Sequence, residues 1–176
     1  QAIITAPAAQ TAKLLADIYP ELAATAGLAR YDPCWTIMLG LEGDHGLSTE
    51  PLRDEAAGIA LGVPEFTRSN QQSSLDAPAL TIQATGAWSQ QHLQDDPQMV
   101  IKSLCQIWQN LSGKPLGKVI TSAAHRWLYA KVTTAAPSDA PRLSHDGKLA
   151  IAGDWLCGPR VEQAFDSGQQ TYHHLR

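Results

Sequence analysis

The sequence predicts an α+β fold with a mixed, mainly antiparallel sheet and flanking helices. Several segments alternate apolar and polar residues with the period of two that is typical of strands. Few helical segments separate these strands, which favours antiparallel neighbours over a regular strand–helix–strand repeat. The clearest helical segment carries one apolar stripe, as expected of a helix that packs on a sheet.

The first quarter of the chain predicts a strand, two helices and a longer strand. Residues 1–5 are typical of a short apolar strand, and residues 7–19 carry apolar side chains at helical spacing up to a proline. A second helix is expected over residues 21–26, and Gly27 can end it. Residues 34–41 alternate and predict the longer strand.

The middle of the chain is less regular. One or two short strands are expected within residues 58–67, where Gly62 and Pro64 interrupt the apolar residues. Residues 80–85 alternate and predict a further strand. Two polar segments predict loops, residues 43–53 and 70–74.

The strongest helix prediction covers residues 97–111. Asp96 can cap its start, Pro97 suits the first turn, and Gly113 can end it. A long strand is expected over residues 119–132, and alternation places three of its side chains on one face: His125, Trp127 and Tyr129. The chain closes with an expected loop, short strand and helix, residues 135–147, 149–153 and 159–172.

Composition excludes several function classes. The net charge of −4, without a Lys/Arg cluster, argues against nucleic acid and a membrane surface as partners. No apolar run approaches the roughly 20 residues that a membrane helix needs. We expect no metal site, and three widely spaced cysteines argue against a disulfide framework and fit a reducing cytoplasm: Cys34, Cys105 and Cys157.

The most informative stretch is residues 149–168, LAIAGDWLCGPRVEQAFDSG. It predicts a buried strand that ends in Gly153, where another group can approach the backbone closely. Asp154 can accept a hydrogen bond from a sugar-like hydroxyl. Free N–H groups of Arg160, Val161 and Glu162 at the helix start favour an anion or a developing negative charge. The pattern also fits an ordinary structural strand–turn–helix.

Five stretches of the sequence carry a family resemblance. The stretch GDW…GPRVEQAFDSG resembles the C-terminal flavin motif of FAD-dependent amine-oxidase-type proteins, most closely their renalase-like bacterial branch. The stretch AIITAPAAQTAKLL resembles the passage by which such proteins leave the FAD domain. The substrate domain of that family is similar to three further stretches, PCWTIMLGL, TGAWSQQHLQDDPQMVIKSLCQIWQNLSG and AHRWLYAKV.

The resemblance implies a flavin oxidoreductase with an FAD domain and a substrate domain. A small-molecule substrate, an amine or a reduced nicotinamide-type compound, would give a hydride to the flavin, and the electrons would pass to oxygen. The resemblance assigns cofactor binding to Gly153, Asp154, Arg160 and Val161, with the Val161 N–H facing the flavin pyrimidine carbonyl. It places three side chains on the substrate side, although they also fit a core-facing or partner-facing strand surface: His125, Trp127 and Tyr129.

One hallmark of the family is missing from the sequence. No GxGxxG turn is present to hold the FAD pyrophosphate, and we interpret Gly40, Gly43 and Gly46 as turn glycines because their spacing is wrong. The chain begins with Gln1 and is interpreted as a C-terminal fragment, inactive alone and binding FAD weakly or not at all. Its expected parts are the end of an FAD-domain strand, a substrate domain, and a returning FAD-domain strand and helix: residues 1–6, 7–147 and 148–176.

A second hypothesis is a non-enzymatic ligand-binding or protein-interaction domain that keeps the substrate-domain fold without FAD. In either case, residues 149–153 and the final helix lack their usual sheet neighbours. We therefore expect their apolar faces to be exposed, mobile or covered by a second copy of the chain. The expected partners are the missing N-terminal FAD-binding half or, as a homodimer, a second copy of the chain.

Overall fold

The computed structural model describes four stretches of the chain, residues 1–42, 47, 50–65 and 78–175. The loop predicted over residues 70–74 lies outside them, as do Gly43 and Gly46. The described residues form helices and strands, and most of the strand pairings are antiparallel. The prediction of an α+β fold with a mixed, mainly antiparallel sheet is confirmed.

The chain folds into two compact units. Unit 1 combines Gln1–Asp32 with Tyr129–Arg176, and unit 2 is Pro33–Leu128. Two long strands, β2 (Arg30–Glu42) and β6 (Lys118–Thr134), contribute residues to both units. The functional division into residues 1–6, 7–147 and 148–176 stays a prediction.

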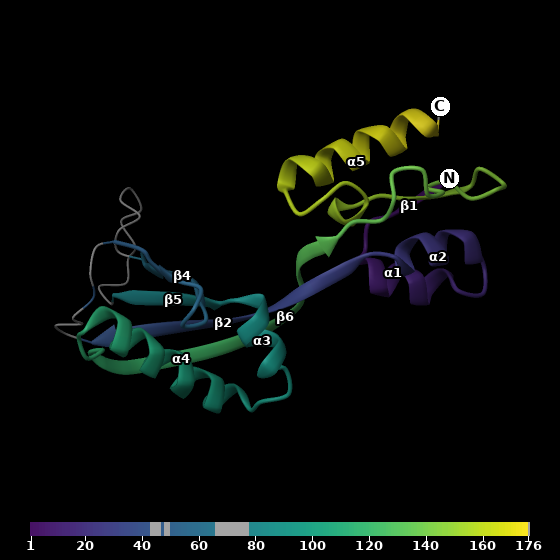
Figure 1. Cartoon of the computed structure of the whole chain (residues 1–176). Helices are drawn as coiled ribbons and strands as arrows, with labels where there is room; N and C mark the ends of the chain where they lie inside the picture. The colour runs from purple at the N-terminus through teal and green to yellow at the C-terminus, as the bar shows by residue number, and fades with distance from the viewer. Residues whose placement is uncertain (43–46, 48–49, 66–77, 176) are drawn as a thin grey trace. The chain divides into compact units, whose positions relative to one another are not determined.

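Unit 2 is built on a five-stranded sheet, with strand order β3–β4–β5–β2–β6 among the described residues. The pairings of β4 with β3, of β5 with β4 and of β2 with β5 are antiparallel. Figure 1 shows helix α4 lying along this sheet. The other elements of the unit are β3 (Leu52–Asp54), β4 (Ile59–Pro64), β5 (Ala79–Ala84), α3 (Gly86–Gln91) and α4 (Pro97–Ser112).

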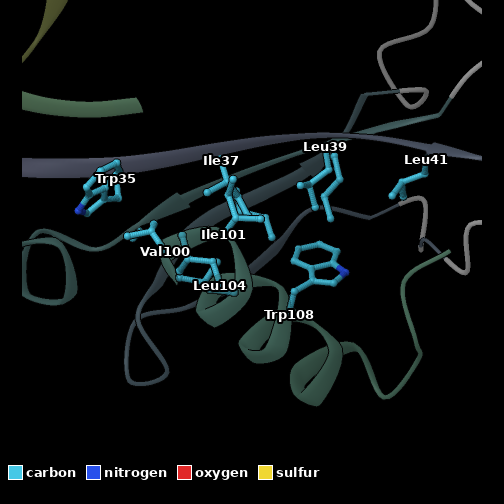
Figure 2. Packing of buried hydrophobic residues seen from close by; sticks show 12 residues of the cluster. Trp35, Ile37, Leu39, Leu41, Val100, Ile101, Leu104 and Trp108 are labelled. Carbon is cyan, nitrogen blue, oxygen red and sulfur yellow. The ribbon is translucent and has the colours of Figure 1, made fainter. Parts of the chain in front are cut away.

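The core of unit 2 lies between β2 and α4. Alternate residues of β2 point toward the apolar stripe of the helix, as Figure 2 shows. Asp96 caps α4 by accepting a hydrogen bond from the Gln98 N–H (2.8 Å), and Gly113 ends it with φ 66°. These observations confirm the predicted strand and helix. The central side chains are Trp35, Ile37, Leu39, Leu41, Val100, Ile101, Leu104 and Trp108.

Three local predictions in unit 2 need correction. Strand β4 continues through Gly62 because the missing side chain makes room for the Trp108 indole, which a Cβ at this position would overlap. The predicted loop over residues 43–53 ends earlier, since Leu52 already pairs with β4. Helix α3 was missed because six residues are too few to show a helical period. Thr85 caps α3 by accepting a hydrogen bond from the Trp88 N–H (3.2 Å).

Unit 1 is a small parallel sheet between two helical layers (Figure 1). Its two strands pair in parallel, with Ile3 opposite Ala150. Helices α1 and α2 pack on one side of the sheet and α5 on the other (Figure 1). The elements are β1 (Ala2–Ile4), α1 (Ala8–Leu15), α2 (Pro20–Gly27), β7 (Leu149–Ile151), the 3₁₀ turn η2 (Asp154–Leu156) and α5 (Val161–His174). Its apolar cluster includes Ala8, Leu15, Leu22, Ala26, Val132, Ile151, Trp155 and Leu156.

The exposure expected for the two C-terminal elements is confirmed for one and wrong for the other. Ala150 and Ile151 of β7 are buried because the α1/α2 cluster covers them. On α5, the apolar side chains of Val161, Phe165 and Tyr172 are exposed. The final helix therefore shows an apolar surface that the described residues leave uncovered.

The contact between Gly62 and Trp108 gives a first testable prediction. Gly62→Ala should lower the free energy of unfolding by about 1–3 kcal/mol, because the added methyl group must displace the Trp108 ring from a packed core. Urea denaturation, followed by tryptophan fluorescence, measures the change. Gly27→Ala is the matched control, since a Cβ at Gly27 meets nothing within 4 Å. Equal stability of the two variants would contradict the packing described.

A polar cluster joins the 142–148 segment to the helical layer of unit 1. Asp146 accepts hydrogen bonds from the Ser144 hydroxyl (2.7 Å), the Lys148 N–H (3.1 Å) and the Tyr19 hydroxyl (3.3 Å). The hydrogen bond from Ser144, followed by that from Lys148, lowers the pKa of Asp146 to about 2. The ionised carboxylate is thus the form that the folded chain favours.

This cluster predicts a loss of stability in acid. The pKa of Asp146 is lower in the folded chain than the ordinary 3.8. The stabilisation that its ionised carboxylate gives the folded chain is therefore complete above about pH 4 and is lost as the pH falls toward 2. Asp146→Asn should therefore flatten the dependence of thermal stability on pH between 4 and 2. Asp166→Asn removes the same charge from an exposed position of α5 and should not flatten it. Parallel curves for wild type and Asp146→Asn would contradict the assignment.

Candidate functional site

The predicted cofactor-binding residues lie together in one strand–turn–helix of unit 1. Gly153 follows β7, and a Cβ at this position would lie 2.5 Å from Nε1 of Trp155. The Gly153 N–H donates a hydrogen bond to the hydroxyl of Ser167 (3.0 Å), which is fully buried in α5. The residue that follows β7 is therefore bonded to the final helix through Ser167. Sequence analysis did not identify Ser167 as part of the site.

Asp154 closes the turn that follows. Its Oδ1 accepts a hydrogen bond from the Trp155 N–H (2.8 Å), and its backbone carbonyl accepts from the N–H groups of Cys157 (2.8 Å) and Gly158 (2.6 Å). Its Oδ2 has no hydrogen-bond partner among the described residues. A partly exposed carboxylate held in this way can accept a hydrogen bond from a ligand hydroxyl.

The start of α5 offers two unused donors. The prediction of a free Arg160 N–H is wrong, because this group donates a hydrogen bond to Oε1 of Gln163 (3.0 Å). Gln163 is itself held by a hydrogen bond from its Nε2 to the Cys157 carbonyl (2.9 Å). The N–H groups of Val161 and Glu162 have no acceptor within the part of the chain described. Backbone donors at the positive end of a 14-residue helix suit a carbonyl oxygen or a negatively charged group.

Tyr129, predicted to face a substrate, lies in unit 1 against another tyrosine. Its ring packs edge-on against Tyr31, with centroids 5.5 Å apart. The Tyr31 hydroxyl accepts a hydrogen bond from the Ala8 N–H (3.2 Å). Burial raises the pKa of Tyr31, and the negative charge of Asp154 adds to the rise. The charge of Asp154 thus acts on Tyr31, a residue that sequence analysis missed because the alternation was followed only from Cys34.

His125 and Trp127 lie together in unit 2, as alternation predicts. Their rings are 4.2 Å apart between centroids, and Trp127 is 53% exposed. A Cβ at Gly40 would lie 2.6 Å from Cγ2 of Thr121, so this face of β6 continues the face of β2 that carries the exposed Met38. Within unit 2, these side chains form an apolar and aromatic surface on the side of the sheet away from α4.

Arg126 fixes the strand that carries this aromatic pair. Its side chain points to the core side, where the guanidinium lies 5.7 Å from the centroid of the Trp35 ring. Nη1 donates a hydrogen bond to the Leu93 carbonyl, in the connection between α3 and α4. The indole N–H of Trp35 donates to the His92 carbonyl in the same connection (2.9 Å). Arg126 is therefore a positioning residue for its two neighbours on β6.

The residues of unit 1 fit part of a flavin cofactor. Val161 and Glu162 supply donors for a carbonyl, and Asp154 supplies an acceptor for a hydroxyl. At Gly153, the space that a Cβ would fill is taken by the Trp155 indole, so the close approach expected at this glycine is made by that ring. Among the described residues, no cluster of three or more His, Cys, Asp or Glu side chains could hold a metal ion. No helix in the same stretches is long and apolar enough to cross a membrane.

Comparison with known proteins identifies the fold. No protein-family model matches the chain. A crystal structure of a protein assigned as a protoporphyrinogen oxidase, from Exiguobacterium sp. 255-15, matches with a TM-score of 0.72 and 14% identity over 97% of this chain and 40% of that chain. Cyclohexylamine oxidase from Brevibacterium oxydans IH-35A matches with a TM-score of 0.66 and 10% identity, over 98% of this chain and 42% of that one.

An oxidoreductase from Methanosarcina mazei is a third neighbour, with a TM-score of 0.60 and 12% identity over 97% of this chain and 42% of that chain. This chain has the fold of FAD amine-oxidase-type proteins. It spans about two fifths of the length of these neighbours. The coarse resemblance seen in the sequence is thus confirmed at the level of fold, while the renalase-like branch stays a prediction.

The hydrogen bond between Gly153 and Ser167 can be tested directly. Ser167→Ala should lower the free energy of unfolding by about 1–3 kcal/mol, because it leaves a buried N–H without an acceptor. The Gly153 amide should also exchange with deuterium faster. Gln169→Ala, at an exposed position of the same helix, should change the free energy of unfolding by no more than a few tenths of a kcal/mol. It should leave the exchange rate of the Gly153 amide unchanged. An unchanged Gly153 exchange rate in Ser167→Ala would show that the bond does not hold the turn.

Proposed function

We propose that the chain is the C-terminal part of an FAD-dependent oxidoreductase of amine-oxidase type, and that unit 1 holds one side of the flavin. The observation that carries the proposal is the pair of unused N–H donors at the start of α5. They lie beside a turn at Gly153 and Asp154, in a fold shared with two named oxidases and an oxidoreductase. Every helix leaves its first N–H groups without an intrahelical acceptor, so it is their place beside this turn, in this fold, that favours a cofactor-binding role.

In this proposal, each residue of the turn has a distinct task. The Val161 N–H donates to a pyrimidine carbonyl of the flavin, and the exposed Arg160 beside it adds positive charge. Asp154 accepts a hydrogen bond from a hydroxyl of the ribityl or pyrophosphate region. When bound, FAD supplies the hydride acceptor. The positive end of α5 stabilises the negative charge that develops on the reduced cofactor.

The substrate side is assigned to the aromatic residues of β6. In unit 2, His125 and Trp127 present exposed rings, and in unit 1 the ring of Tyr129 packs against Tyr31. Aromatic faces suit a small organic substrate, either an amine, whose cationic form they attract, or a flat reduced nicotinamide-type ring. The nucleotide-cradling part of such an enzyme would come from the rest of the fold, so this chain alone is expected to bind FAD weakly and to be inactive.

The donor at Val161 provides the test. In the gene product that contains this chain, Val161→Pro should weaken flavin binding by roughly twofold to tenfold, because it deletes one hydrogen bond to a neutral carbonyl. Proline is compatible with the first position of a helix, and Arg160, at φ −116° and ψ 153°, has the backbone that a following proline requires. Titration followed by flavin absorbance and fluorescence measures the affinity.

Val161→Ala is the matched control, since it shortens the same side chain but keeps the N–H. Equal affinities of Val161→Pro and Val161→Ala would remove the proposed contact. A gene product that remains colourless and cannot be reconstituted with FAD would overturn the whole proposal. That result would favour the second hypothesis, a binding or interaction domain that works without a cofactor.

A further inference from the structure

The side chain of Gln163 joins the two ends of segment 157–160 in unit 1. Its Oε1 accepts a hydrogen bond from the Arg160 N–H (3.0 Å), and its Nε2 donates one to the Cys157 carbonyl (2.9 Å). A carboxamide can satisfy a donor and an acceptor at once, and here the two belong to different parts of the chain. Gln163 therefore forms a bridge between the turn after β7 and the start of α5.

Helix capping accounts for only one of these two hydrogen bonds. Gln163 is the third residue of α5, and a Gln or Glu at this position commonly accepts a bond from the N–H of the residue before the helix. The bond from Nε2 instead reaches outside the helix, to a carbonyl that precedes Gly158 and Pro159. It therefore holds the turn in addition to the helix start.

The backbone at Gly158 makes room for the bridge. A Cβ at this position would lie 2.4 Å from Nε2 and 2.6 Å from Oε1 of Gln163, so a larger residue would displace the carboxamide. Gly158 also has a φ of 136°, which residues with a side chain rarely adopt. The position of the Gln163 side chain thus depends on a glycine at this point of the turn.

The bridge connects the two kinds of ligand-binding group assigned to unit 1. On one side, the Asp154 carbonyl accepts hydrogen bonds from the N–H groups of Cys157 (2.8 Å) and Gly158 (2.6 Å). On the other side, the bridge ends one residue before Val161. The turn that carries the Asp154 carboxylate and the first unused donor of α5 are therefore linked through the side chain of Gln163.

The bridge also determines which N–H groups a ligand can use. It occupies the Arg160 N–H, so the first donors left over are those of Val161 and Glu162, which have no acceptor in the part of the chain described. A site whose acceptor and donors already keep a constant spacing loses less conformational entropy when it binds a rigid ligand. Loss of the bridge should therefore weaken binding without removing any group that contacts the ligand.

We propose that Gln163 is a positioning residue of the cofactor site in unit 1, because its carboxamide holds the turn at Asp154 and the N–H donors of α5 at a constant spacing. It acts through the backbone of segment 157–160 and contacts neither flavin nor substrate. The inference rests on the proposed function, which supplies the ligand that both groups bind.

Hydrogen exchange in the gene product that contains this chain, measured without flavin, tests the bridge itself. Gln163→Met keeps the length and the helix propensity of the side chain but removes both hydrogen bonds. It should speed exchange of the Gly158 amide, which bonds to the Asp154 carbonyl, by about fivefold or more. Loss of a helix cap alone would affect the amides at the helix start and leave the Gly158 amide unchanged.

Gln169→Met is the matched control, since it makes the same replacement at an exposed position of the same helix. It should leave exchange of the Gly158 amide unchanged. The Gly153 amide, which bonds to Ser167, reports in each variant whether unit 1 is folded. An unchanged Gly158 amide in folded Gln163→Met would overturn the proposal.

A second variant keeps the test sharp where Gln163→Met also exposes the Gly153 amide. Gln163→Glu retains an acceptor for the Arg160 N–H, so the helix start stays capped, but it has no donor for the Cys157 carbonyl. It should speed exchange of the Gly158 amide as Gln163→Met does. A Gly158 amide as slow as in the wild type would show that capping is the whole role of Gln163.

Flavin binding tests the consequence for the site. Gln163→Met should weaken the binding of reduced FAD more than that of oxidised FAD, because correctly placed N–H donors bind an oxygen that gains negative charge on reduction. The ratio of the two affinities, obtained from the reduction potentials of bound and free flavin, should fall by about threefold or more. A helix that is merely looser lowers both affinities equally, and an unchanged ratio would overturn the proposal.

The two measurements separate this proposal from the proposed function. A gene product that cannot be reconstituted with FAD overturns the flavin assignment, and exchange of the Gly158 amide then decides whether Gln163 holds the turn. A gene product that binds FAD, with the Gly158 amide unchanged in Gln163→Met, retains the flavin assignment and removes the positioning role.

Discussion

The burial of one indole, that of Trp155, determines the arrangement of unit 1. The ring is 1% exposed and lies in the cluster that α1 and α2 form over β7. Its Nε1–H donates to the Ala6 carbonyl (3.2 Å), and its backbone carbonyl accepts from the Ala136 N–H (2.8 Å). One residue thus ties together the exit of β1, the segment after β6 and the turn before α5. Because the ring leaves no room for a side chain at Gly153, the same burial determines the residue that precedes Asp154.

This constraint explains why polar groups are buried and apolar groups exposed on α5. Satisfying the backbone around the Trp155 turn requires acceptors and donors close to β7, and Ser167 and Thr171 supply them. The helix must therefore turn its small polar residues inward. Its larger apolar residues are then directed to the side, where the described chain offers them no cover. The sequence predicted a helix over residues 159–172, but it did not identify which side of that helix is buried.

How much of the fold could be predicted from the sequence depended on the length and periodicity of each element. Long periodic segments such as β2, α4 and β6 could be located from the sequence because burial of one face imposes their period. Short elements without a full period, α3 and β3, could not. The sequence was enough to place the residues from Gly153 to Val161 in one strand–turn–helix. It was also enough to place His125 and Trp127 on one face of the same strand. Tyr31 and Ser167 could not be found, because their roles depend on contacts with residues more than ten positions away in the chain.

The exposed features of the molecule carry an energetic argument about function. Exposed large apolar side chains favour aggregation, so chains that keep them generally have a partner or ligand that covers them. The ring of Trp127 is held outward by Arg126, whose hydrogen bond and stacking on Trp35 lie on the opposite side of the strand. Contacts of Arg126 and Trp35 on the core side of the sheet thus keep the aromatic ring of Trp127 exposed to solvent. Within unit 1, the unused N–H donors at the start of α5 can bind a polar group of a ligand. Within unit 2, the exposed aromatic surface suits an apolar or aromatic group. Each unit thus presents groups that a purely structural role leaves unexplained, and this is the physical basis for preferring a ligand-binding role for each of them.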